Sequence, residues 1–126
     1  MQTIEIPQNK WTQALDEFSA IHDGWLVSLE LLSSALGVQP QIRDLPLRGV
    51  TAEHRPGKPV ITITAAHNDG QMFTHLIGAP THVRIERTDE GADVALQIES
   101  AEGTAAILRF RNAAVPVTAD GVPRRD

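Results

Sequence analysis

Five histidines offer the first chance of chemistry in this chain: His22, His54, His67, His75 and His82. Imidazole is the commonest metal ligand and the usual acid or base near neutral pH. A metal site needs ligands that converge within a few Å. The first question is therefore whether the surrounding elements bring these rings together.

Two glycine turns set the strands that carry the histidines. The segments 68–70 and 101–103 each have the form of a three-residue hairpin loop, whose last position needs the positive φ that glycine adopts readily. The predicted pairs are Ala65 with Phe73, Ile63 with His75 and Ile61 with Ile77 in the first hairpin, and Ile98 with Ala106, Leu96 with Leu108 and Val94 with Phe110 in the second. Apolar residues thereby fall opposite apolar ones, with His75 as the exception.

The segment 78–82 is short enough to place Ile77 beside Val83. The next loop uses either Asp89-Glu90 alone or Asp89 to Ala92, two choices that differ by a slip of two residues. Both give a five-strand antiparallel meander over residues 60–110, with one apolar and one polar face.

Other elements follow from periodicity. Residues 2–6 form a short edge strand before Pro7. A helix from about Asn9, its N-cap, carries Trp11, Leu15, Phe18 and His22 on one stripe and ends at Gly24. Residues 25–31 read as a strand or a helix. The alternation favours a strand, with a helical turn near 33–36, and further strands follow at 39–43 and 47–54, broken by Pro46 and Gly49. The predicted fold is α+β: an N-terminal helix packed on a mostly meander antiparallel sheet of about seven strands, curling toward a half-barrel.

The registers argue against a metal centre among the sheet histidines. His75 and His82 are predicted on opposite faces of the sheet. His67 shares a face with His75 but lies roughly 13 Å further along it. We therefore expect neither a metal nor another cofactor.

His75 sits on the apolar face, and two interpretations are open. The favoured one is a buried or half-buried ring whose nitrogens bond a hydroxyl or a carbonyl group. The alternative is a small-molecule or enzyme pocket between helix and sheet, lined by His75 and Trp25, with Trp11 and Phe73 near them.

The polar face carries charges of both signs, including Arg84, Glu86, Glu99 and Arg109. Two carboxylates on one face could act as a glycosidase pair. Cross-strand ion pairing on a wet surface is the favoured interpretation. No nucleophile or phosphate-binding motif accompanies them, so no catalytic residue is predicted.

Apolar side chains also point outward in these registers. Met72, Leu76 and Ile107 form a predicted cluster on the polar face, bordered by Arg84, and such clusters mark contact sites. Either the segment 31–59 folds over them or an isologous dimer forms through this face.

Composition excludes several classes of function. The chain has 126 residues, a formal charge of -5 and no cysteine. We expect no nucleic-acid partner, because no positive patch is available for phosphates. No segment is apolar enough to span a bilayer and the start lacks a signal peptide, which predicts a cytoplasmic protein. A single domain over 1–117 and a mobile tail over 118–126 are predicted.

Several short segments resemble a known bacterial family, domain of unknown function 5335. They are Trp11, His22-Asp23-Gly24-Trp25-Leu26-Val27, Leu45-Pro46-Leu47, Ala79-Pro80-Thr81-His82-Val83-Arg84, Ile98-Glu99-Ser100-Ala101-Glu102-Gly103-Thr104 and Leu108-Arg109-Phe110-Arg111. The resemblance covers nearly the whole chain and implies no reaction, substrate or catalytic residue. Together these features predict a non-enzymatic binding or interaction module that self-associates as a homodimer.

Overall fold

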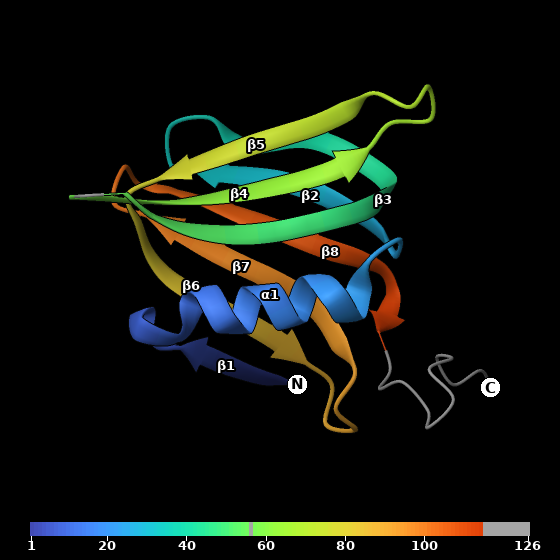
Figure 1. Ribbon diagram of the computed structural model, residues 1–126, viewed down its shortest axis with the longest axis horizontal. Helices are drawn as coiled ribbons and strands as arrows, with labels where there is room; N and C mark the ends of the chain where they lie inside the picture. The colour runs from blue at the N-terminus through green and yellow to red at the C-terminus, as the bar shows by residue number, and fades with distance from the viewer. Residues whose placement is uncertain (56, 115–126) are drawn as a thin grey trace.

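A computed structural model describes residues 1–55 and 57–114. It contains one α-helix and one antiparallel sheet of eight strands, one more than the sequence predicted (Figure 1). The elements are β1 (Gln2–Ile6), the 3-10 helix η1 (Gln8–Lys10), α1 (Trp11–His22), β2 (Leu26–Ser33), β3 (Gly37–Arg55), β4 (Lys58–Ala66), β5 (Met72–Gly78), β6 (Pro80–Arg87), β7 (Asp93–Ser100) and β8 (Thr104–Ala114). The α+β class is confirmed.

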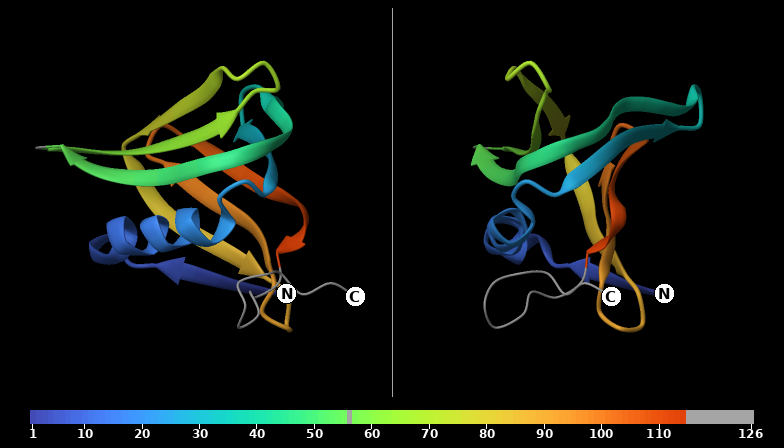
Figure 2. Two further views of the ribbon diagram at one scale, coloured as in Figure 1. Left: turned by 45° about the vertical axis from the view of Figure 1, so that its right-hand side comes forward. Right: turned by 90° about the vertical axis from the view of Figure 1, so that its right-hand side faces the viewer.

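The sheet has the order β1-β6-β7-β8-β2-β3-β4-β5. It curls strongly, so that β4 and β5 stand away from the plane of β6, β7 and β8, while α1 lies across the inner side against β3 (Figures 1 and 2). The two ends of the order are β1 and β5, which makes these the edge strands.

Both glycine hairpins have the predicted register. Ile63 pairs with His75, and Leu96 pairs with Leu108. The pair of Val94 with Phe110 does not form, because the register shifts between Asp93, which pairs with Ala114, and Ala95, which pairs with Arg109. Between these two pairs β7 has one residue and β8 has four, which is more than the single extra residue of an ordinary bulge.

The loop between β6 and β7 follows a third possibility. The N–H of Thr88 donates to the carbonyl of Ala92 at 2.9 Å, and Gly91 has φ 90°, so the loop is Asp89-Glu90-Gly91. It is the same loop type as the other two, and a bulge after Glu86 restores the pair of Ile85 with Leu96. The strand register is therefore that of the longer predicted loop.

The predicted pairing of β5 with β6 is wrong. β6 pairs instead with β1 and β7, and β8 pairs with β2. Ala79 has φ 49°, and its carbonyl accepts the N–H of Ala101 at 2.9 Å, so the chain turns a corner here instead of reversing. The continuous five-strand meander is thus divided between two regions of the sheet.

A single long strand replaces the two that Pro46 and Gly49 were expected to separate. The first half of β3 pairs with β2 as far as Pro46, and the second half pairs with β4 from Leu47 onward. A register shift between Leu47 and Gly49 marks the change of partner. Pro46 and Gly49 therefore lie where one strand changes partner and do not separate two strands. The helical turn at 33–36 is also absent; a turn ends at Gly37, with φ 71°.

Helix α1 has the predicted buried stripe of Trp11, Leu15, Phe18 and His22. Its start differs, since η1 contains Asn9 and no side chain caps the helix. The indole N–H of Trp11 donates to the carbonyl of Ile6 at 2.9 Å, which ties the helix to β1. Residues 115–126, which include the predicted tail at 118–126, lie outside the described part of the chain.

Candidate functional site

His75 borders a small cavity on the inner side of the sheet. The cavity has a volume of about 130 Å³ and lies between β5 and the ends of β2, β7 and β8, with Leu31, Ile98 and Thr104 on its wall. The ring is half-buried, and this burial lowers the pKa of His75. Pockets for drug-sized ligands span about 300–1,000 Å³, so this space is small for such a ligand.

The other predicted pocket residues lie in different surroundings. Trp25 packs edge-on against His22 and Phe110, with ring centroids 5.4 and 5.9 Å apart. Trp11 is buried at the start of α1. Phe73 lies two residues before His75 on β5, with its ring 6.2 Å from that of His67. The structure brings Phe73 and His75 to one strand face but leaves the two tryptophans elsewhere.

A different histidine, His22, belongs to a buried cluster of ionisable side chains. His22, at the end of α1, is only 2% exposed. Its Nε2 lies 3.1 Å from Oδ2 of Asp93 on β7, and its Nδ1 lies 2.7 Å from the carbonyl oxygen of Phe18. Nε of Arg87, on β6, donates to Oδ1 of Asp93 at 2.6 Å. The helix end and the neighbouring strand β6 thus both contact one carboxylate on β7.

The hydrogen bonds of His22 limit its chemistry. A carbonyl oxygen can only accept, so Nδ1 carries a proton and donates to Phe18. One more proton must lie between Nε2 and Asp93, on either side, because two lone pairs cannot bond each other. Both ring nitrogens are therefore occupied, and neither is free to take a proton from a substrate.

This arrangement changes the pKa of Asp93. Burial raises its pKa, but the hydrogen bonds from His22 and Arg87 and the positive charges of these groups outweigh that effect. The pKa of Asp93 is therefore lowered. Breaking a buried pair of this kind leaves an uncompensated polar group in the interior.

The position of Arg87 in the sequence is a signal for this cluster, which an analysis of apolar periodicity alone overlooks. Arg87 follows Val83 and Ile85 at a spacing of two, which puts it in phase with the apolar face of β6. An arginine in phase with buried residues needs an acid nearby. That acid, Asp93, lies just past the β6–β7 loop. Its contact with His22, 71 residues earlier, depends on the tertiary fold.

The outer face carries the cross-strand ion pairs that the sequence favoured. Nη1 of Arg84 donates to Glu99 at 2.7 Å, and Nε of Arg84 donates to Glu5 at 2.9 Å. The hydrogen bond from His82 is the largest cause that lowers the pKa of Glu5, and the charge and hydrogen bond of Arg84 lower it further. Nε of Arg109 donates to Glu30 at 3.0 Å. Glu5, Glu30 and Glu99 each contact a basic side chain on this face.

The predicted interface residues do not form one patch. Met72 and Leu76 lie on β5 and are 52% and 54% exposed. Ile107 lies on β8 between Glu30 and Gln97 and is only 9% exposed, so its predicted place in an exposed cluster is wrong. The segment 31–59 does not cover the first two, since it forms strands of the sheet itself.

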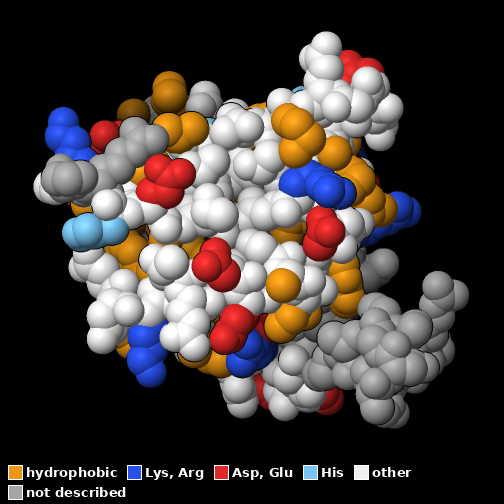
Figure 3. All heavy atoms as spheres, viewed as in Figure 1, with side chains coloured by type: hydrophobic (Ala, Val, Ile, Leu, Met, Phe, Trp, Pro, Cys, Tyr) orange, Lys and Arg blue, Asp and Glu red, His pale blue; other side chains and the backbone are white. Residues whose placement is uncertain are grey.

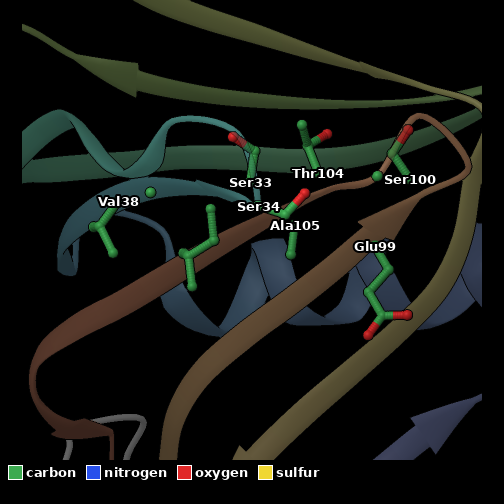
Figure 4. Close-up of a pocket in the computed structure, with 10 residues that line it drawn as sticks. Ser33, Ser34, Val38, Glu99, Ser100, Thr104 and Ala105 are labelled. Atoms are coloured by element: carbon green, nitrogen blue, oxygen red, sulfur yellow. The ribbon is translucent and has the colours of Figure 1, made fainter.

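A further hollow lies on the side of the sheet away from the helix (Figure 4). It has a volume of about 490 Å³ at the β2–β3 and β7–β8 turns, and Val38 and Ala105 supply apolar walls. Two of its serines bond backbone groups. The Ser33 hydroxyl accepts the N–H of Leu36 at 3.0 Å, and the Ser100 hydroxyl donates to the carbonyl of Gly78 at 2.8 Å. No histidine lines this hollow to activate them.

The distribution of basic side chains over the described surface agrees with the negative net charge of the chain. Lys and Arg side chains are scattered singly over the face that carries α1 (Figure 3). No group of three or more metal-binding side chains converges within the described ranges. None of their helices has the length and apolar character to cross a membrane.

One curled antiparallel sheet with a single helix across its inner side makes this an α+β domain. The chain belongs to DUF5335, a family of unknown function, whose model matches residues 2–117. No curated protein and no solved structure matches it. Membership in this family therefore implies no particular reaction or ligand.

Proposed function

We propose that the protein is a non-enzymatic interaction module that self-associates through the free edge of β5. The observation that carries this proposal is the composition of that edge. β5 contains no Asp, Glu, Lys, Arg or Pro, yet it pairs only with β4 within the described chain. An edge strand presents unpaired N–H and C=O groups, and natural proteins usually protect such edges with charges or proline.

The side chains of β5 suit a second copy of the same strand. In an antiparallel pair around a two-fold axis at Thr74, Met72 of one copy lies opposite Leu76 of the other. Phe73 then lies opposite His75 on the inner side. Exposed apolar groups meet each other in this register, and the same surface serves both partners. Strand addition of this kind combines main-chain hydrogen bonds with alternate side-chain contacts.

Light scattering tests the proposal. The natural chain is expected to have twice the mass of one 13.7 kDa chain at micromolar concentration. A double variant with Met72→Lys and Leu76→Lys is expected to be monomeric and folded, because both side chains already face solvent within one chain. Leu36→Lys is the matched control, since Leu36 is 68% exposed on the β2–β3 turn, away from the edge. A monomeric natural chain would overturn the proposal.

A further inference from the structure

The buried cluster of His22, Arg87 and Asp93 borders a second pocket, which the self-association above does not use. This pocket has a volume of about 210 Å³ and lies between α1, β1 and β6. Four isoleucines form most of its remaining wall: Ile4, Ile6, Ile21 and Ile85. It lies beside β1, at the opposite end of the strand order from β5.

The charge of the cluster points to an anion. His22 and Asp93 share one proton between Nε2 and Oδ2, so the two side chains together are neutral whichever atom holds it. Arg87 adds one positive charge. Glu17 also lines the pocket but is exposed, where water screens its charge. The inner end of the pocket is therefore positive.

The geometry of Arg87 leaves a binding surface. Among the described residues its guanidinium makes one hydrogen bond, from Nε to Asp93, and its side chain is 38% exposed. The two terminal nitrogens make no bond to that part of the chain. Two parallel N–H groups of arginine match the two oxygens of a carboxylate. Asp93 holds the guanidinium in place for that contact.

The apolar walls define the rest of the ligand. Ile21 is 51% exposed although it lies on a helix whose neighbouring stripe is buried. A volume of 210 Å³ corresponds to roughly seven waters, which is room for a head group and about four to six carbon atoms. We propose that this pocket binds a short branched carboxylate, with its head group on the terminal nitrogens of Arg87 and its hydrocarbon part against Ile4, Ile21 and Ile85.

The experiment is a titration of the full chain with 3-methylbutanoate, followed by amide NMR shifts. A saturable response is expected at α1, β6 and β7, and the neutral amide 3-methylbutanamide is expected to bind about tenfold more weakly, which corresponds to ~1.4 kcal/mol. Absence of a saturable response, or equal binding of acid and amide, would overturn the proposal.

Two pairs of variants separate the head group from the pocket. Arg87→Gln is expected to weaken 3-methylbutanoate binding about tenfold or more, and Arg109→Gln, on the outer face, is expected to leave it unchanged. Ala14→Leu keeps the charge cluster and fills the pocket, so binding is again expected to fall about tenfold. Its control is Ala20→Leu, at an exposed position of the same helix. Natural affinity in Ala14→Leu would place the acid elsewhere and contradict the inference.

Discussion

The two edges of the sheet are built in opposite ways. β1 carries Glu5, whose carboxylate contacts His82 and Arg84 on β6, and Pro7 directly follows the strand. The N-terminal amine beside it pairs with Asp89 at 2.9 Å. β5 has no charge to repel a neighbour and exposes Met72 and Leu76.

The contrast continues beneath each edge. Under β1, a buried ion pair holds α1, β6 and β7 together at Asp93. Under β5, the half-buried ring of His75 faces a small cavity. Ion pairs therefore cover the β1 edge, whereas exposed apolar side chains lie along the β5 edge. This difference indicates which edge of the molecule is available to a partner.

Removal of the buried acid is expected to have the largest effect. Asp93→Ala leaves His22 and Arg87 without their shared partner, so we expect the free energy of unfolding to fall by about 3–5 kcal/mol in urea titrations. Glu30→Ala is the control on the wet face, where the pair with Arg109 is expected to contribute less than about 1 kcal/mol. Equal losses in the two variants would remove the distinction between the buried and exposed pairs.

A charge exchange at β5 tests the proposed register. Lysine at both positions 72 and 76 in one variant, or glutamate at both in another, is expected to weaken each homodimer about hundredfold, which corresponds to ~2.7 kcal/mol. An equimolar mixture is expected to form heterodimers, because Met72 of one copy faces Leu76 of the other. Analytical ultracentrifugation measures both results, and a mixture that stays monomeric would rule out this register.

Making β1 resemble β5 gives the third test. Glu5→Val removes the edge charge, so a chain with two unprotected edges is expected to form species larger than a dimer in light scattering. Glu86→Val is the control, because Glu86 lies on β6 between two paired strands. If Glu5→Val remains a dimer, its carboxylate is not what protects β1.

The smallest effect is expected at His75. Burial lowers its pKa, so the unfolded chain binds the proton more readily and stability falls as the pH drops through the ordinary histidine range near 6.5. His75→Leu is expected to remain folded and to lose this pH dependence between about pH 7 and 5 in thermal melts. Unfolding of the variant at neutral pH would show that the polar atoms of the ring are needed.

The predictable part of the fold is the part that depends on neighbouring residues. Gly70 and Gly103 set two hairpins, and the spacing of Trp11, Leu15 and Phe18 gave the buried stripe of α1. These features follow from turn geometry and side-chain periodicity within about twenty residues.

The missed part depends on long-range packing. No local rule places β2 between β8 and β3, and the corner at Ala79 has the length of a hairpin link. His22 has the spacing of a core residue, so its partner on β7 becomes visible only after the chain has folded. The exposed β5 edge was hidden for the same reason, since its predicted partner β6 pairs elsewhere.

Hydrogen exchange at β5 tests the central claim most directly. Every second backbone N–H of an edge strand points away from its single neighbour and exchanges freely unless another strand covers it. We expect the outward amides of β5 to become protected as protein concentration rises, while those of β1 remain unprotected. Fast exchange of the outward β5 amides in a sample that light scattering shows to be dimeric would contradict association through this edge.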